Sequence, residues 1–361
     1  MILARRLFLT REVDREALAL RSGRPAPPLG AQVVLLTGLG PEQAAALGGD
    51  ADAAVVESVE SLPPALREAV NPPPPPALAL AGRRWAFDQR PTILGVVNVT
   101  PDSFSDGGRF ATTELAVAHG LRLIDDGADW LDVGGESTRP NAAPVSLDEE
   151  CARVLPVLEA LRARAPSVPL SIDTSKAEVA RRALQSGASL VNDVSAFADP
   201  AMAAVVAEAR AAACLMHMQG TPRTMQVQPR YADVVQEVGD ALEAAIARAV
   251  AGGVDRSRLL IDPGIGFGKA LEHNLALLRH LEALRGLGVP VLLGTSRKSF
   301  LGALTGAREP EQRVLASAAS VAIAAARGQA DVFRVHDVKE TRDALAVAAA
   351  IGASRGGATR W

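Results

Sequence analysis

One pattern recurs through most of this 361-residue chain: a short apolar run ends in a polar residue and is followed by a helix-length segment. The runs are rich in β-branched residues, as is typical of strands buried on both faces. They occupy residues 93–99, 130–135, 168–172, 190–191, 213–216, 259–261, 289–293 and 330–335. Between them, apolar residues repeat with helical spacing, most clearly at residues 115–126, 147–163, 234–251 and 311–326. Eight such units over residues 91–352 predict an α/β fold of the (β/α)8, or TIM-barrel, type, which usually needs roughly 250 residues.

A separate segment precedes this barrel. Within residues 1–70, strand-like runs at 32–36 and 53–56 flank a helix-like run at 41–47, which predicts a small N-terminal α/β extension. We assign it no function.

The proline-rich run 71–76 favours polyproline II, and we interpret it as a semi-rigid linker between the two parts. The alternative is a ligand for a proline-binding domain. Alternation around Gly82 and Arg83 in residues 77–90 predicts a β-hairpin that closes the bottom of the barrel, so the barrel domain is expected to span residues 77–355.

The composition fits a cytoplasmic enzyme and excludes several other classes. Apolar residues make up 48% of the chain, the net charge is −3, and no basic stripe indicates nucleic-acid binding. The most apolar helical run, residues 314–326, is too short to span a membrane, and the N-terminus carries charges before any signal-like apolar core forms. Cys151 and Cys214 lack CxxC spacing, so we expect buried neutral thiols rather than a disulfide or a zinc site.

Polar side chains gather where the predicted strands end, which is the face on which barrels of this kind bind ligands. Asp173, Asn192 and Asp262 form one group, because two carboxylates and an amide suit the hydrogen-bonding edge of a planar heterocycle such as a pterin. A second group is cationic and suits a phosphate or pyrophosphate. It consists of Arg139, Arg297, Lys298 and Arg334, with His336 beside them.

Two loops on the same face combine hydroxyl side chains with Gly or Pro hinges. They are TPDSFSDGGRF, which begins at residue 100, and GESTRPNAAP, which begins at residue 135. We interpret both as mobile loops above a ligand. Asn98 stands at the end of the first buried run, where its amide either bonds the neighbouring backbone or faces a ligand; its position leaves both open.

Each polar residue also has a purely structural interpretation. A strand-end Asp173 can cap the next helix, Arg297 and Lys298 can be solvated loop charges, and His336 can be a core histidine. The glycine-rich turn at residues 264–268 is weak evidence for phosphate binding, because such turns also simply join a strand to a helix. The joint placement of these groups at one end of eight strands favours a ligand site.

Eight motifs resemble those of the dihydropteroate synthase family of folate biosynthesis. From Asn98 to Val338 they are NVTPDSFSDGG, LDVGGESTRP, SIDTSK, LVNDVSA, HMQGTPRTMQ, LIDPGIGFGK, GTSRKSFLG and RVHDV. The resemblance implies a transferase that condenses (7,8-dihydropterin-6-yl)methyl diphosphate with 4-aminobenzoate to give 7,8-dihydropteroate and pyrophosphate. It also implies Mg²⁺ as cofactor, an aminobenzoate site that sulfonamides target, and a homodimer formed through the later helices.

The resemblance further implies roles for single residues. Asn98 would bind the Mg²⁺ that accompanies the diphosphate. The pterin would be held by Asp173, Asn192, Asp262 and Lys298, with Met218 and Phe267 as apolar walls. The pyrophosphate group would contact Thr138, Arg139, Arg334 and His336. The aminobenzoate site would consist of Ser296, Thr138, Arg139, Pro140 and Phe104, and the catalytic charges would be those of Lys298, Arg334 and Asp173.

Two other functions remain open at this point. A pterin-binding methyltransferase would share the barrel and the pterin group but would lack the diphosphate-binding residues. A non-catalytic paralogue that acts as a binding module would be expected to have lost Asn98 or one of the loops. The chain retains GESTRP, SRK and RVHD as well as Asn98, which favours the synthase.

Overall fold

The computed structural model describes residues 2–8, 32–49, 53–56, 59, 62–63, 66–67, 74–87, 90–100, 109–138 and 142–352. The predicted barrel is present. Its parallel strands are β6 (Thr92–Asn98), β7 (Trp130–Gly134), β8 (Leu170–Asp173), β9 (Leu190–Asp193), β10 (Ala212–Met216), β11 (Leu259–Asp262), β12 (Leu292–Leu293) and β13 (Val332–Val335). Neighbouring strands pair in the order β11-β10-β9-β8-β7-β6-β13-β12, and a parallel bridge between Ile261 and Val291 joins the two ends. The sheet is therefore closed.

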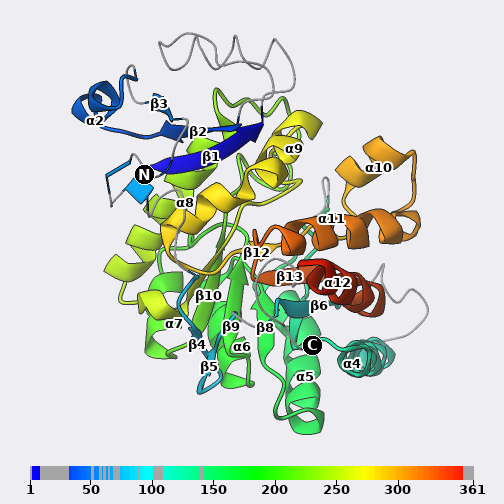
Figure 1. Cartoon of the computed structure of the whole chain (residues 1–361). Coiled ribbons are helices and arrows are strands. Elements are labelled where there is room, and N and C mark those ends of the chain that lie inside the picture. Colours follow the sequence, from blue (N-terminus) through cyan, green and yellow to red (C-terminus); the bar gives the residue numbers. More distant parts are fainter. Residues whose placement is uncertain are drawn as a thin grey trace.

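Helices surround this sheet (Figure 1). They are α4 (Arg109–Asp126), α5 (Leu147–Arg164), α6 (Ala177–Gln185), α7 (Met202–Glu208), α8 (Val234–Ala251), α9 (Leu271–Arg279), α10 (Ser299–Thr305), α11 (Val314–Ala326) and α12 (Val338–Gly352), with short 3-10 helices η3 (Arg256–Arg258), η4 (Leu281–Leu287) and η5 (Pro310–Arg313). The α8 helix has the predicted bounds, because Asp233 caps it by accepting hydrogen bonds from the backbone of Val235 and Gln236. The segment predicted as one helix at 311–326 is instead divided into η5 and α11.

Two further observations concern the described ranges. Both cysteines are free and buried, as predicted. No helix in those ranges is both long and apolar enough to cross a membrane.

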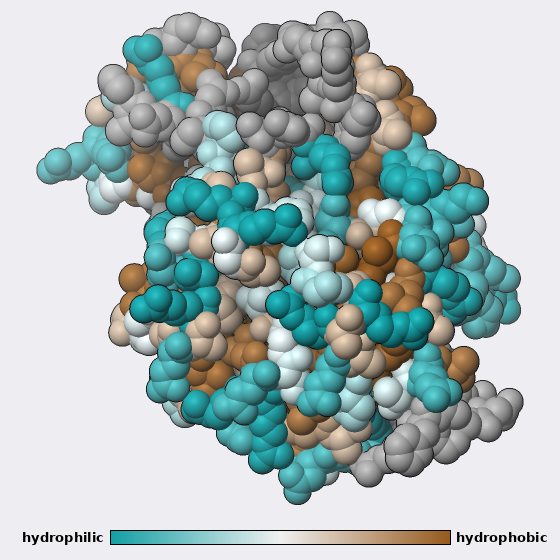
Figure 2. Space-filling view, turned by 90° about the horizontal axis from the view of Figure 1, so that it is seen from below, coloured by the Kyte–Doolittle hydropathy of each residue, from teal (hydrophilic) through white to brown (hydrophobic). Residues whose placement is uncertain are grey.

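The lower part of the barrel is filled by apolar residues that point inward from the strand starts. Leu94, Trp130 and Leu260 belong to this cluster, together with Leu78 and Leu80 of the hairpin formed by β4 (Leu78–Leu80) and β5 (Arg83–Trp85). The hairpin therefore closes the N-terminal end of the barrel, as predicted. Seen from below in Figure 2, hydrophilic residues are spread over the molecular surface, with smaller hydrophobic areas between them.

The N-terminal extension contains an antiparallel sheet with the strand order β1-β2-β3. Its elements are β1 (Leu3–Phe8), β2 (Gln32–Thr37), α2 (Pro41–Ala46) and β3 (Ala53–Val56), of which the sequence predicted all but β1. Leu3 belongs to the barrel core, since β1 lies beside η4. The Thr37 hydroxyl donates a hydrogen bond to Gln236 of α8 (2.6 Å). The extension thus docks against the outside of the barrel near α8 (Figure 1); residues 71–73 of the predicted linker lie outside the described ranges.

Candidate active site

The candidate site lies at the C-terminal ends of the barrel strands, and its residues follow from the alternation within each strand. Leu190 and Leu260 point into the apolar lower layer of the barrel. Residues two positions apart in a strand face the same side, so Asn192 and Asp262 also point inward, one layer higher. By the same two-residue spacing, Asp132 points inward above Trp130, and Arg334 points inward above Val332. A charged layer therefore stands directly above the apolar one.

A single cavity at this end gathers most of the predicted site. Its lining consists of Thr138, Asp173, Asn192, Val194, Met216, Asp262, Phe267, Gly294, Ser296, Lys298, Arg334 and His336. All of these except Val194, Met216 and Gly294 were predicted from the sequence. Residues from strands far apart in the chain, such as Thr138 and His336, thus meet because the sheet is closed.

Arg334 joins two carboxylates inside the cavity. Its Nε donates to Asp132 (2.6 Å) and one Nη donates to Asp173 (2.7 Å). Burial disfavours the charge of the guanidinium, but the two carboxylates outweigh burial and raise the pKa of Arg334. For Asp173, burial is the dominant effect and raises the pKa of the carboxyl group to about 7, although the charge of Arg334 opposes this rise.

Asp173 is therefore not a helix cap. The first backbone N–H of α6, that of Ala177, donates to Asp199 instead (2.9 Å). The carboxylate of Asp173 remains directed into the cavity, where it is available to a ligand as well as to Arg334.

Lys298 and Asp262 form a second group of opposite charges in the cavity lining. The Asp262 carboxylate accepts a hydrogen bond from the backbone of Gly264 (2.7 Å), while Lys298 donates to the backbone oxygen of Ile265. The Lys298 ammonium also lies 4.7 Å from the centre of the Phe267 ring, within cation–π range. Burial lowers the pKa of Lys298 to about 8, although Asp262 opposes the shift. Lys298 is thus a half-buried, partnered cation and not a solvated loop charge.

Ser296 and His336 are hydrogen-bonded to each other across the cavity rim. The Ser296 hydroxyl lies 3.0 Å from His336 Nδ1 and accepts a hydrogen bond from the His336 backbone (3.1 Å). Grouping Arg297 with the cavity cations was wrong. Its guanidinium forms a double hydrogen bond with Asp337 (2.6 and 3.0 Å) and does not line the cavity.

Several predicted residues do not line this cavity. Met218 lines a neighbouring cavity, which shares Val194 and Met216 with the first. Asn98 ends β6, is half-buried, and makes no side-chain hydrogen bond to another described residue. The sequence left two roles open for the Asn98 amide, a bond to the neighbouring backbone or contact with a ligand, and the structure does not show the backbone bond. The three remaining predicted residues, Phe104, Arg139 and Pro140, lie outside the described ranges.

Sequence reasoning missed Asp132, a fully buried carboxylate at the centre of the site. Its Oδ2 accepts hydrogen bonds from Arg334 (2.6 Å) and from the Asn192 amide (3.0 Å), so it orients two predicted ligand-binding residues. One signal in the sequence was available: Asp132 stands two positions after Trp130 in an otherwise apolar run, and strand alternation places both on the inner face.

Comparison with known proteins agrees with this geometry. The family described as "Pterin binding enzyme" matches residues 94–336. A dihydropteroate synthase of Neisseria meningitidis serogroup B is 47% identical over 278 residues, which is 75% of this chain and 96% of that protein. The solved structure of Xanthomonas albilineans dihydropteroate synthase with 4-aminobenzoic acid has a TM-score of 0.72 and 52% identity, and the match covers 77% of this chain and 99% of the other.

A second structure of the Xanthomonas albilineans enzyme, in complex with 7,8-dihydropteroate, has a TM-score of 0.70 and 50% identity over 77% of this chain and 99% of the other. Each of these matches covers nearly the full length of the known protein and about three quarters of this one. The chain therefore belongs to the pterin-binding enzyme family and, within it, to the dihydropteroate synthases.

Proposed function

We propose that this chain condenses (7,8-dihydropterin-6-yl)methyl diphosphate with 4-aminobenzoate to give 7,8-dihydropteroate and pyrophosphate. One observation carries the proposal: a single cavity holds Asp173, Asn192 and Asp262 together with Lys298 and Arg334. The first three suit a pterin edge, and the cations suit a diphosphate. The Xanthomonas structures with 4-aminobenzoic acid and with 7,8-dihydropteroate support the same reaction.

The test is an assay of the purified chain with both substrates and Mg²⁺. Dihydropteroate, measured by chromatography, and pyrophosphate, measured by a coupled enzyme, should form in equal amounts. Neither substrate alone should give dihydropteroate. Release of pyrophosphate without dihydropteroate would contradict the proposal.

The pterin would be bound by groups whose other bonds are already made. The Asn192 amide nitrogen donates to Asp132, which leaves its carbonyl oxygen as an acceptor for the ligand. One oxygen of Asp262 is held by Gly264, so the other faces the cavity lined by Lys298. A site that is fixed before the ligand arrives loses little conformational entropy on binding.

Asn98 fits the Mg²⁺ ion expected beside the diphosphate. The described residues include no cluster of three His, Cys, Asp or Glu side chains that could hold a metal. Mg²⁺, however, usually keeps several waters and takes only one or two protein oxygens in addition to phosphate oxygens. The half-buried Asn98 amide, which makes no hydrogen bond to a described residue, offers such an oxygen. When bound, the ion would add positive charge beside the departing pyrophosphate.

The reaction breaks the bond between the pterin methylene carbon and the diphosphate oxygen and forms a bond from that carbon to the amine nitrogen. Lys298, Arg334 and His336 would stabilise the negative charge that collects on the pyrophosphate. Asp173, when ionised, would stabilise the positive charge that develops on the pterin. The aromatic amine is neutral at pH 7, so its attack needs no strong general base, and it loses its proton to solvent.

The aminobenzoate would lie against Ser296 and Thr138, which line the cavity rim, and against Phe104, Arg139 and Pro140.

The proposed functional unit is a homodimer. On α11 and α12, which pack against each other on the outside of the barrel (Figure 1), four large apolar side chains are exposed. They are Leu315, Ile323, Val347 and Ile351, with 82, 56, 61 and 68% of their surface accessible. Apolar residues concentrated in this way mark protein interfaces.

A further inference from the structure

We propose that Glu136, Lys176 and Glu150 form a charge network that fixes the two ends of the segment 136–145 and thereby positions Thr138 for aminobenzoate. The inference rests on the proposed function, because it assigns positioning residues to that reaction. None of the three lines the cavity, so each would act through Thr138, which does.

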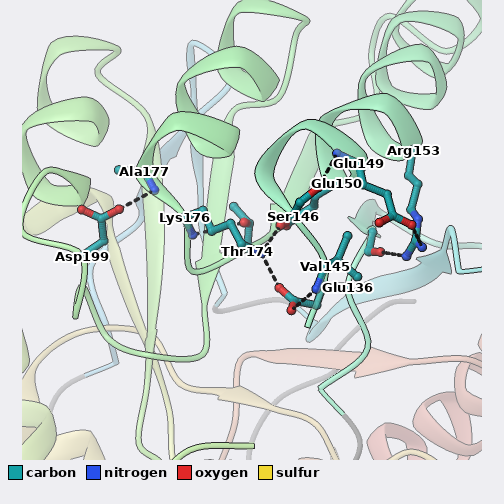
Figure 3. A network of polar contacts seen from close by, with 11 residues as sticks. Glu136, Val145, Ser146, Glu149, Glu150, Arg153, Thr174, Lys176, Ala177 and Asp199 are labelled. Carbon is teal, nitrogen blue, oxygen red and sulfur yellow. Dashed lines mark hydrogen bonds and ion pairs between the residues drawn. The ribbon is translucent and has the colours of Figure 1, made fainter. Parts of the chain in front are cut away.

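Glu136 uses both of its carboxylate oxygens (Figure 3). Oε1 accepts a hydrogen bond from the backbone of Val145 (3.0 Å), and Oε2 accepts one from the Lys176 ammonium (2.5 Å). The bond from Val145 ties Glu136 to a residue nine positions later in the chain. Since Thr138 stands only two residues after Glu136, fixing Glu136 restricts where Thr138 can lie at the cavity.

Lys176 connects the loop to the body of the barrel. Its ammonium also donates to Glu150 of α5 (2.5 Å), a glutamate with no exposed surface. Burial disfavours the charge of Lys176, but the two glutamates outweigh burial and raise its pKa. One cation thus serves two carboxylates, and Oε1 of Glu150 is a buried atom without a hydrogen-bond partner among the described residues. The network therefore carries an excess negative charge that holds Lys176 firmly.

Lys176 is also tied to the pterin side of the cavity. Its backbone N–H donates to the Thr174 hydroxyl (3.2 Å), and the Thr174 N–H donates to the backbone oxygen of Asn192 (3.1 Å). Asp173, which precedes Thr174, lines the cavity together with Asn192. The network thus joins the base of the loop to the segment that carries the pterin-binding groups.

The surroundings of the network are rigid. Arg153 of α5 donates to the backbone oxygen of Gly135 (2.7 Å), and a Cβ atom at Gly135 would come within 2.7 Å of Val154. Ser146, directly after the loop, caps α5 by accepting from Glu149 (3.2 Å). The residues on both sides of the loop are therefore fixed, and Glu136 links them across its base.

The decisive variant is Glu136→Gln, which keeps an oxygen to accept from Val145 but loses the ion pair with Lys176. We expect the KM for aminobenzoate to rise about tenfold, which corresponds to ~1.4 kcal/mol. The Kd of a pterin without diphosphate should change by less than about twofold, because its binding groups are untouched. Lys176→Arg, which retains the cation, should stay closer to the wild-type KM than Glu136→Gln does.

Asp148→Asn is the matched control, because Asp148 is a neighbour on α5 whose side chain is 93% exposed and lies 3.8 Å from Arg182, outside the network. It should leave both constants unchanged. An unaltered KM for aminobenzoate in Glu136→Gln, or an equal loss of pterin affinity, would overturn the inference.

A second measurement does not need activity. In Glu136→Ala the Val145 amide loses its acceptor, so hydrogen exchange in a peptide containing Val145 should become faster, whereas Asp148→Asn should leave it unchanged. Equal exchange in wild type and Glu136→Ala would contradict the network. If the wild-type chain were inactive but Glu136→Ala still exchanged faster than wild type at Val145, the proposed function would be rejected and the network would be supported.

Discussion

A single carboxylate, Asp262, carries much of the pterin recognition that we propose. Asp262→Asn keeps the size of the side chain and an oxygen for Gly264 but removes the charge beside Lys298. Loss of charge-assisted hydrogen bonds to the ligand should raise the Kd of a pterin about 100-fold, or ~2.7 kcal/mol. Isothermal titration calorimetry measures this directly. Asp148→Asn, at a side chain that is 93% exposed, is the control; if Asp262→Asn bound pterin as tightly as that control, Asp262 would serve only the turn at Gly264.

The pH dependence of the reaction should be bell-shaped. Burial raises the pKa of Asp173 to about 7 and lowers that of Lys298 to about 8. The carboxylate therefore becomes charged as the pH rises through about 7, and the ammonium loses its charge above about 8, so kcat/KM for the pterin diphosphate should peak between them. Asp132→Asn removes a negative charge that raises the pKa of Asp173, so the acid limb should move to lower pH. An acid limb that stays in place, or moves upward, would contradict this assignment.

The same shift has a consequence for stability. The pKa of Asp173 in the folded protein lies above its ordinary value of 3.8, so the folded state binds this proton more tightly than the unfolded chain. The resulting contribution to stability is complete below about pH 4 and is lost as the pH rises through about 7. Asp173 thus lowers stability at the pH at which it would be catalytically useful, a common cost of active-site residues.

Strands and helices were more predictable than the contacts between them. The polar residues at strand ends were assigned to one face because every barrel strand presents its C-terminal end there. The predicted strand at 289–293 was too long, however, because Pro290 has no N–H to give to a ladder, and regular pairing begins only at Leu292. The bond from Arg334 to Asp132 joins residues 202 positions apart, and only the closed sheet brings them together.

Two neighbouring loops should couple the ligand sites. Ser296, after β12, and His336, after β13, share a hydrogen bond (3.0 Å), so an anion that engages His336 also fixes Ser296 on the aminobenzoate side. Pyrophosphate with Mg²⁺ should therefore tighten the binding of a sulfonamide, which resembles aminobenzoate, by about fivefold or more. Ser296→Ala should abolish most of this coupling, whereas Ser299→Ala, at an exposed position of α10, should not. Titration of the sulfonamide with and without pyrophosphate tests the idea, and equal affinity in wild type would show that the two sites are independent.

At the scale of the whole molecule, the described part of the extension and the active site are separate. Leu3 and Thr37 dock the extension on η4 and α8, and no described residue before Thr138 lines the cavity. The family match also begins only at residue 94. The residues proposed to carry out the reaction therefore belong to the barrel, and the extension packs against the outside of the barrel.

The exposed apolar residues of α11 and α12 predict how two barrels associate. Wild-type protein should sediment with twice the 37.5 kDa mass of one chain. Ile323→Glu combined with Val347→Glu places charges within the proposed interface, where their desolvation is costly, and should give monomers in analytical ultracentrifugation. Leu304→Glu is the matched control, since Leu304 is 54% exposed but lies on α10. Because none of the residues that line the cavity lies on α11 or α12, the monomeric variant should keep pterin affinity. A monomeric wild type, or dissociation by Leu304→Glu alone, would show that these two helices do not form the interface.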